Sequence, residues 1–237
     1  ALHANLQVVV AFRMLPKVVW EMPELGTFNL HASLLPNYRG AAPINWAIIN
    51  GETKTGVTTF FIDDKIDTGA MILSEELAIA KEETAGQLHD RLMVLGSQTV
   101  VKTLKLIETG NVVTKIQKES DDIKTAYKLN KENCKIDWSK SGAEIHNLIR
   151  GLSPYPAAWC DFKDRNQEWT VKIYDAQFQP EAHNHITGKL IVSKKEIKIT
   201  VADGYLKIVS IQFPGKKKMS TSELLNGIGF SENAYAC

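Results

Sequence analysis

An amide, an imidazole and a carboxylate are spaced in this sequence so that they can serve one reaction. Asn29 and His31 are two residues apart in a segment typical of a β-strand, so their side chains leave the same face of a sheet. Asp67 lies in the polar loop that follows a second strand-like segment, residues 56–62. These groups suit acyl-type transfer to an amine, in which the amine loses a proton and the carbonyl oxygen becomes negative.

The position of the polar pair on its strand also favours a ligand site. We expect the strand to stop near Ser33, because Pro36 cannot continue a central strand and loop-forming residues follow it. The pair then lies at the carboxyl end of a strand, where open α/β sheets hold ligands. Taken singly, the pair also fits a structural hydrogen bond and Asp67 an ordinary turn residue; the combination favours catalysis.

The motifs around these residues resemble the methionyl-tRNA formyltransferases. The resemblance spans nearly the whole chain, and its motifs are residues 29–36, 39–44, 56–58, 66–69, 15–19, 136–139 and 214–220. The Ser-Leu-Leu-Pro core is shared by all transferases that take formyl groups from 10-formyltetrahydrofolate. The stretch Arg39-Gly40-Ala41-Ala42-Pro43 and the carboxyl-terminal matches narrow the choice within that group.

The resemblance implies a role for each matched residue. Asn29 and His31 would stabilise the oxyanion formed from the formyl group, and Asp67 would orient His31 or a water and help to remove the amine proton. The formyl donor would be 10-formyltetrahydrofolate, held by Phe12, Arg13, Met14, Leu15, Ile62, Asp63 and Asp64. The substrate would be held by Ser33, Leu34, Leu35, Pro36 and Arg39, and by Lys216, Lys217 and Lys218. Without the resemblance, Arg13 fits a solvated charge, and Met14 and Leu15 fit core packing.

The expected fold is α/β, a partial doubly wound (Rossmann-like) formyltransferase domain followed by a small OB-like β-barrel. Only one helical segment separates the apolar run 8–12 from the strand that carries Asn29. The opening βαβ units of the family are therefore missing, and we expect a fragment or a chain whose first part was removed. We predict a catalytic domain over 1–115, a linker over 116–133 and a tRNA-binding barrel over 134–237.

Capping signals and alternation place the elements of these domains. A capping box at residues 84–87 predicts a long helix that ends near Gly110, and a second at 141–144 predicts a short helix that ends at Gly151. Five segments then alternate apolar with polar residues: 159–162, 170–174, 188–193, 196–202 and 205–213. Asp203-Gly204 is a tight-turn signal between the last two, and five short strands suggest a small barrel.

Composition and charge limit the functional classes. The chain has 237 residues, 44% of them hydrophobic and 23% charged, with no apolar run near the roughly 20 residues of a membrane helix. Its three cysteines form no paired motif, so we expect a reducing, cytoplasmic setting and no metal site. Residues 1–123 carry 11 basic against 15 acidic side chains, and residues 124–237 carry 17 against 12. A basic barrel is compatible with contact to phosphates, and Lys216–Lys218 precede a possible helix start, although such a run is also typical of a solvated surface.

These observations favour a cytoplasmic enzyme that formylates the α-amino group of methionyl initiator tRNA, with tRNA and folate as partners and no membrane or protein partner implied. Two alternatives stay open. One is a formyltransferase for a small amine, such as an amino sugar nucleotide or glycinamide ribonucleotide, and the other is a non-catalytic RNA-binding fragment. Binding of tRNA without folate would indicate the fragment.

Overall fold

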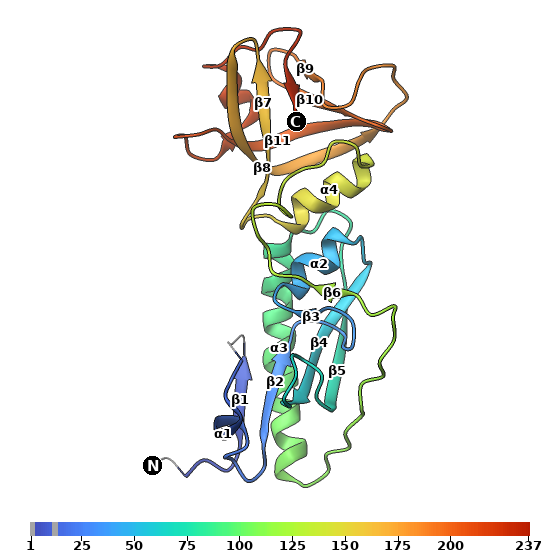
Figure 1. The fold of residues 1–237 in the computed structure, drawn as a ribbon, viewed down its shortest axis with the longest axis vertical. Coiled ribbons are helices and arrows are strands. Elements are labelled where there is room, and N and C mark those ends of the chain that lie inside the picture. The colour runs from blue at the N-terminus through green and yellow to red at the C-terminus, as the bar shows by residue number, and fades with distance from the viewer. Residues whose placement is uncertain (1–2, 11–13) are drawn as a thin grey trace. The chain divides into compact units, whose positions relative to one another are not determined.

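The chain is described by a computed structural model over residues 3–10 and 14–237 (Figure 1). It folds as two compact units, which divide the chain mainly between residues 128 and 129. The first unit holds residues up to 47, 52–81 and 87–128, and the second holds 48–51, 82–86 and 129–237. The expected linker, residues 116–133, spans this border.

The first unit contains a four-stranded sheet in the order β1-β2-β4-β5. Its strands are β1 (Gln7–Val10), β2 (Thr27–His31), β4 (Lys54–Phe61) and β5 (Met71–Ala78). The expected α/β class is confirmed, but only β1 and β2 run parallel, while β2, β4 and β5 are antiparallel neighbours. Within the described residues, the part of the sheet that holds the candidate site is therefore not a continuous parallel sheet.

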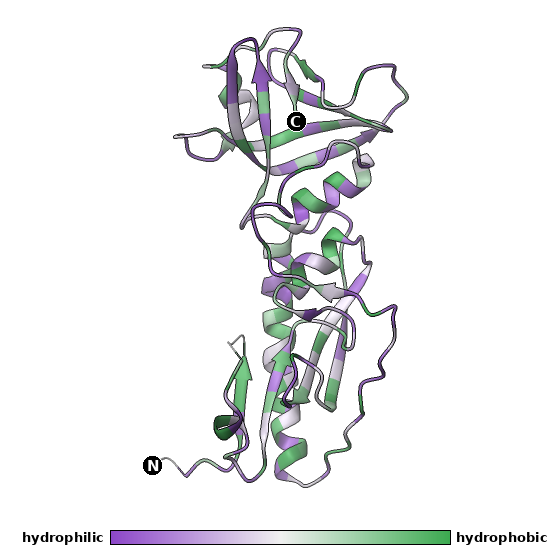
Figure 2. Cartoon of the chain, viewed as in Figure 1, coloured by the Kyte–Doolittle hydropathy of each residue, from purple (hydrophilic) through white to green (hydrophobic). Residues whose placement is uncertain are grey.

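The predicted long helix is confirmed as α3 (Ala85–Glu108), which follows the sheet along its length (Figure 1). Its apolar and polar residues alternate along the ribbon, as Figure 2 shows, and Leu88 and Leu92 are buried. The helix lies close to the sheet at Gly96, where an added Cβ would approach the Leu30 side chain to 2.7 Å. Gly110 ends it with φ +68° and an N–H bonded to Ile107 O at 3.1 Å.

Four shorter elements complete this part of the chain. Helix α1 (Lys17–Trp20) contacts the start of β2, where Thr27 Oγ1 donates to Trp20 O, and β3 (Arg39–Gly40), α2 (Pro43–Ile49) and β6 (Thr125–Ala126) are the others. The two-residue strands β3 and β6 pair in parallel, so part of the expected linker is fixed to the loop that follows β2. A backbone bridge between Met71 and Lys115, the residue just before that linker, attaches the chain there to β5.

The second unit is built on an antiparallel sheet in the order β13-β7-β8-β11-β10-β9, with β12 paired to β11. Its strands are β7 (Ala158–Asp164), β8 (Gln167–Pro180), β9 (Leu190–Val192), β10 (Ile197–Val201), β11 (Gly204–Gln212), β12 (Met219–Ser220) and β13 (Tyr235–Ala236). The hydrogen bonds Leu190 N–H to Ala234 O and Ala236 N–H to Gly188 O join the two ends of this order. The five predicted strands and the hairpin at Asp203-Gly204 are confirmed, and the sheet nearly closes into a barrel.

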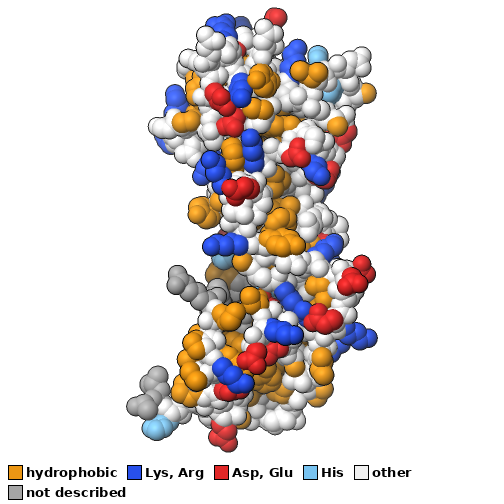
Figure 3. Space-filling view, in the orientation of Figure 1, with side chains coloured by type: hydrophobic (Ala, Val, Ile, Leu, Met, Phe, Trp, Pro, Cys, Tyr) orange, Lys and Arg blue, Asp and Glu red, His pale blue; other side chains and the backbone are white. Residues whose placement is uncertain are grey.

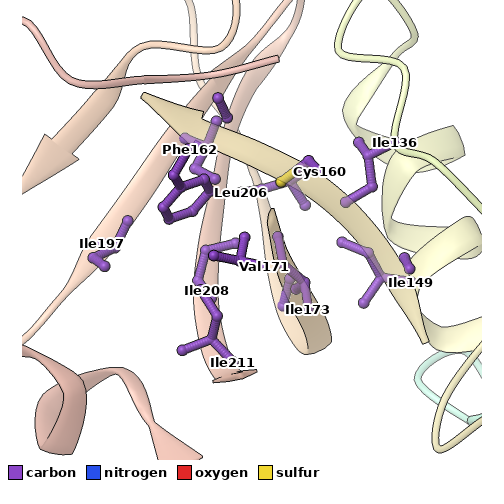
Figure 4. Packing of buried hydrophobic residues seen from close by; sticks show 14 of the residues in the cluster. Ile136, Ile149, Cys160, Phe162, Val171, Ile173, Ile197, Leu206, Ile208 and Ile211 are labelled. Carbon is purple, nitrogen blue, oxygen red and sulfur yellow. The ribbon is translucent and has the colours of Figure 1, made fainter. Parts of the chain in front are cut away.

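The barrel is filled by aliphatic and aromatic side chains that alternate along the strands. Phe162, Val171, Ile173, Leu206 and Ile208 point into it from three neighbouring strands (Figure 4). The predicted helix at 141–151 is α4 (Gly142–Gly151), and its Ser141 and Glu144 form the expected capping box. A further capping box, Ser220 with Glu223, begins α5 (Thr221–Leu225).

Candidate active site

A cavity of about 860 Å³ opens in the first unit beside the end of β2. This size lies within the range of about 300–1,000 Å³ that is usual for sites holding small molecules. Its wall includes Asn29 and His31 from β2, Gly40 from β3 and Asp67 from the loop after β4. The apolar part of the wall includes Met14, Leu15, Ile62, Ile66, Leu92 and Val100. The three residues with chemistry that the sequence singles out therefore share one cavity.

Asn29 contributes a buried amide whose carbonyl oxygen has no partner in the described residues. Its side chain lies on β2 and the residue is only 4% exposed. The Oδ1 atom has no hydrogen-bond partner among the residues that the structure describes. Buried polar groups are normally hydrogen-bonded, and an exception in a cavity wall marks a group available to a ligand.

One ring nitrogen of His31 is hydrogen-bonded to the backbone, and the other faces Asp67. Its Nε2 lies 2.8 Å from Tyr38 O, and because a carbonyl oxygen only accepts, Nε2 carries the hydrogen. In the neutral ring Nδ1 then presents a lone pair, 3.7 Å from Asp67 Oδ2. That distance is too long for a direct hydrogen bond, so the two acceptors are arranged to receive a proton from a group placed between them.

The loop that carries Asp67 follows a path to the site that could not be predicted from the sequence. The sequence places it at the carboxyl end of the strand next to Asn29 and His31. Since β4 is antiparallel to β2, that end, Phe61, pairs with Phe28 at the start of β2. The loop must therefore turn back along the sheet to bring the carboxylate to His31.

Two glycines allow the close packing that this loop requires. Gly69 lies against β4 so tightly that an added Cβ would be 1.7 Å from Phe61 O. Gly40 has φ +120°, and a Cβ there would be 2.4 Å from Ala126 O. The Gly40 N–H donates to Asp67 Oδ2 at 2.9 Å, so this glycine orients the carboxylate directly. Any side chain at either position would displace the backbone that supports Asp67.

The motif Ser33-Leu34-Leu35-Pro36 holds the loop after β2 and does not line the cavity. Ser33 is fully buried, its hydroxyl donates to Asn37 O, and its carbonyl accepts from Thr58 Oγ1 at 2.7 Å. Leu35 N–H in turn donates to the same threonine hydroxyl at 3.2 Å. These contacts fix the path of the chain toward Tyr38, whose carbonyl orients His31.

The residues predicted to hold the formyl donor divide into three groups. Met14, Leu15, Ile62 and Asp63 line the cavity. Asp64 is not among the lining residues, and its carboxylate lies 3.9 Å from Lys17 Nζ. Phe12 and Arg13 lie outside the residues that the structure describes.

The charged network next to the site includes a carboxylate whose protonation is shifted. Glu52 accepts hydrogen bonds from Tyr38 Oη at 2.6 Å and from Lys124 Nζ. Burial alone would raise the pKa of Glu52, but these hydrogen bonds and the charge of Lys124 outweigh it and leave that pKa below its ordinary value. The side chain of Tyr38, whose backbone carbonyl holds His31, is thereby fixed by Glu52.

The predicted phosphate-binding lysines lie on the second unit. Lys216, Lys217 and Lys218 are exposed, and Lys218 Nζ lies 4.7 Å from the ring centre of Tyr174. The helix start beside them is closed by its own capping box, in which Glu223 accepts from the Ser220 backbone at 2.8 Å. On the face drawn in Figure 3, basic and acidic side chains are intermingled over this unit.

Sequence reasoning missed the backbone and amide groups that position the site. Tyr38 and Gly40 act through a carbonyl and an N–H, which no side-chain pattern reveals. Gln117 donates to two carbonyls of the Asp67 loop from a stretch of charged residues without periodicity. Only Gly40 carried a signal, as part of the 39–44 motif, in which a role was predicted for Arg39 alone.

The residues that the structure describes hold neither a metal-binding cluster nor a helix able to span a membrane. Over residues 3–10 and 14–237, no group of three or more His, Cys, Asp or Glu side chains is arranged to hold a metal ion. None of the described helices combines the length and the apolar character that crossing a bilayer requires.

Two family models match the chain. Residues 1–104 match the model described as formyl transferase, and residues 128–229 match the formyl transferase C-terminal domain. The stretch between the two matches contains Gln117.

Curated relatives match almost the full length of the chain. A methionyl-tRNA formyltransferase of Flavobacterium johnsoniae is 74% identical over 234 residues, which cover 99% of this chain and 74% of the relative. A methionyl-tRNA formyltransferase of Bacteroides fragilis is 47% identical and covers 97% of this chain and 72% of the relative.

Solved structures with the same fold include other formyltransferases. An N-formyltransferase from Helicobacter canadensis, in complex with folinic acid and dTDP-3-aminofucose, is 26% identical with a TM-score of 0.64. The match covers 83% of this chain and 70% of that chain. HypX from Aquifex aeolicus in complex with tetrahydrofolic acid has a TM-score of 0.69 at 20% identity, over 93% of this chain and 38% of that one.

Proposed function

Because this chain belongs to the methionyl-tRNA formyltransferase family, we propose that it transfers a formyl group from 10-formyltetrahydrofolate to the α-amino group of methionyl initiator tRNA. The observation that carries the proposal is the 74% identity to a relative of that name over 99% of the chain. The reaction belongs to translation initiation, and we assign the chain to the cytoplasm, where that process occurs.

The cavity has the properties that a folate requires. Apolar side chains from several segments offer a surface for a flat pterin ring, and the free amide of Asn29 offers a polar contact deep in the wall. We propose Met14, Leu15, Ile62 and Asp63 as contacts of the donor, together with Phe12, Arg13 and Asp64 from the resemblance. The donor supplies the formyl carbon that the amine attacks.

Asn29, His31 and Asp67 divide the work of the transfer. The amine nitrogen bonds to the formyl carbon, the bond from that carbon to the folate nitrogen breaks, and a proton passes from the amine to the folate nitrogen. Asn29 donates a hydrogen bond from its Nδ2 amide group to the negative oxygen that develops. The resemblance gives His31 to the oxyanion, but with its hydrogen on Nε2 the neutral ring has none at Nδ1 to donate. We therefore propose that His31 receives the amine proton at Nδ1 and then donates from the same atom, while Tyr38 O keeps the ring in place.

Asp67 completes the arrangement as the anion beside the ring. Its carboxylate lies 3.7 Å from Nδ1, so it stabilises the imidazolium that forms when His31 takes the proton. The Gly40 N–H fixes one carboxylate oxygen and therefore the distance between the two groups.

The tRNA would be held in part by the second unit. Lys216, Lys217 and Lys218 provide exposed ammonium groups suited to phosphate oxygens, which position a nucleic acid without reading its sequence. At the active site, Arg39 and the loop Ser33–Pro36 are proposed to shape the approach of the methionyl end.

Formyl transfer to charged initiator tRNA tests the proposal directly. The chain is incubated with 10-formyltetrahydrofolate and methionyl initiator tRNA, and formyl-methionine is measured on the recovered tRNA. Since the match covers 74% of the Flavobacterium johnsoniae relative, a chimaera that adds the uncovered part of that relative is assayed in parallel. We expect transfer that is lost in the His31→Ala variant.

Two controls distinguish the alternatives. Transfer to an amino sugar nucleotide in place of the tRNA would contradict the proposed acceptor. Binding of tRNA with neither folate binding nor transfer, by both the chain and the chimaera, would indicate an RNA-binding module and contradict the proposed activity.

A further inference from the structure

The segment that follows α3 is built into the support of the active site, and we infer that Gln117, with Arg39 behind it, is a positioning residue for the catalytic loop that carries Asp67. Gln117 lies between the two family matches, in a stretch that neither model covers. The kinetic part of this inference rests on the proposed function, and its structural part does not.

Gln117 holds the loop by two hydrogen bonds from one buried amide. The residue is 5% exposed, and its Nε2 donates to Asp67 O and to Gly69 O, both at 2.9 Å. Both amide hydrogens are thus committed to carbonyls of the same turn. These bonds bracket Asp67, whose carboxylate faces His31 on the other side.

Arg39 fixes the direction in which this amide points. Its Nε and Nη2 donate to Gln117 Oε1 at 3.0 and 2.8 Å, in the fork geometry of a guanidinium. Because Oε1 receives both bonds, the NH₂ group must face the Asp67 loop, and the amide cannot be turned around. Arg39 Nη1 also contacts Glu119 Oε1 at 3.1 Å, which secures the guanidinium from the same segment.

The loop needs this support because its backbone is strained at Asp67. Asp67 has φ +56°, in the left-handed region that residues other than glycine seldom adopt. Such a conformation persists only where the surroundings determine it, and it is common at functional sites. Gln117 binds the carbonyl of the strained residue itself, so it holds the carboxylate at its distance from His31.

The same segment also fixes the backbone groups that orient His31 and Asp67. Through the β3–β6 pairing, Thr125 and Ala126 lie beside Arg39 and Gly40, and Ala41 N–H donates to Ala126 O. Tyr38 N–H donates to Lys124 O. Tyr38 O, which orients His31, and Gly40 N–H, which orients Asp67, therefore both lie in residues 38–41, and these are hydrogen-bonded to residues 124–126.

A charge-for-amide substitution isolates the role of Gln117. Gln117→Glu keeps the acceptor for Arg39 but replaces the donor to Asp67 O and Gly69 O by a second acceptor. We expect kcat to fall about 10-fold, as small displacements of a catalytic group do, with the KM values for both substrates unchanged. Gln98→Glu, at an exposed position of α3, is the matched control and should keep wild-type kcat. Arg39→Lys, which loses the fork, should lower kcat by a smaller factor.

A second mutation shows whether Gln117 acts through Asp67. In an Asp67→Asn background, Gln117→Glu should change kcat less than about twofold, because the group that it positions is already removed. The inference would be overturned if Gln117→Glu lowered kcat by the same factor in the wild-type and Asp67→Asn backgrounds. It would also be overturned if Gln117→Glu raised KM and left kcat unchanged. Absence of formyl transfer by the wild-type chain and the chimaera would instead count against the proposed function.

Hydrogen exchange tests the structural part without any activity. Backbone amides of residues 62–70 should exchange faster in Gln117→Glu than in the wild type, while the amides of β4 keep their wild-type rates. In the Gln98→Glu control, both groups of amides should exchange at wild-type rates. Unchanged exchange over residues 62–70 in Gln117→Glu would show that the loop does not depend on this amide, and it would overturn the inference whatever the kinetic result.

Discussion

The cavity wall of the first unit keeps polar groups without complete partners, whereas the interior of the barrel in the second unit is filled by apolar side chains. Asn29 Oδ1 is unpartnered and His31 Nδ1 faces Asp67 Oδ2 across 3.7 Å. The barrel core consists of residues such as Phe162 and Ile173, and the buried unpartnered atom of that unit, within the described residues, is Nε1 of Trp138. The first unit thus holds groups ready for chemistry, and the second is organised for packing.

This contrast separates the expected effects of mutation. Changes at the cavity should reduce turnover while the free energy of unfolding stays constant. Changes in the barrel should reduce the free energy of unfolding while kcat, measured on the folded protein, stays constant.

The largest effect on stability is expected in the barrel core. Phe162 is fully buried and contacts Phe213 and Phe230 edge to face. Phe162→Ala should lower the free energy of unfolding by about 3–5 kcal/mol, because the cavity left behind is only partly closed by relaxation. Urea unfolding measures this loss, and Tyr235→Ala, at a side chain that is 42% exposed, is the control. Similar losses in the two variants would contradict the role given to the core.

The largest effect on turnover is expected at Asp67. Asp67→Asn removes the negative charge and keeps a residue that tolerates the left-handed backbone. We expect kcat to fall about 10²-fold to 10³-fold, while the urea midpoint stays at the wild-type value. Asp121→Asn, at an exposed position outside the cavity lining, should leave both unchanged. If Asp67→Asn lowered the free energy of unfolding as much as Phe162→Ala does, the proposed contrast between a reactive first unit and a packed second unit would be contradicted.

A smaller effect on stability is expected at the start of α4. Ser141 and Glu144 satisfy the first backbone N–H groups of this helix. Ser141→Ala should cost about 1 kcal/mol in the free energy of unfolding, and Glu144→Gln, which can still accept the same bonds, should cost less. Denaturant titration of both variants checks the order; a larger cost for Glu144→Gln would refute the capping interpretation.

The smallest effect is a pH dependence of the second unit. Burial lowers the pKa of His146 below its ordinary value of 6.5, although Glu82 at 3.1 Å opposes the shift. The unfolded chain therefore binds more protons in this range, so stability is full above pH 6.5 and declines as the pH falls toward the lower folded pKa. His146→Gln should flatten the thermal midpoint between pH 7 and pH 5, and the exposed control His89→Gln should not. If the thermal midpoint of His146→Gln varied with pH as steeply as that of the wild type, His146 would be ruled out as the cause of the pH dependence.

The barrel could be predicted from the sequence because its strands carry one buried face. Burial alternates along β7, and the turn at Asp203-Gly204 has the residues that a tight hairpin needs. Strand β5 and helix α2 were not predicted from the sequence. In β5 the adjacent Glu75 and Glu76 obscure a weak alternation.

The site could be predicted only as far as its side chains. Asn29, His31 and Asp67 line one cavity, and their types and spacing in the sequence had indicated that they could lie together. The supporting groups could not be predicted, since they are backbone atoms of Tyr38 and Gly40 and the amide of Gln117, which come together only through the fold.

Asn29→Leu tests the central contrast most directly, because it replaces the unpartnered amide by an apolar side chain of similar size. The account predicts that kcat for formyl transfer falls about 10²-fold or more, while the free energy of unfolding is unchanged or slightly higher, since no protein hydrogen bond is lost. Both quantities are measured on the same preparation, in the chain and in the chimaera. Retained turnover, or a loss of unfolding free energy comparable to that of Phe162→Ala, would contradict the account.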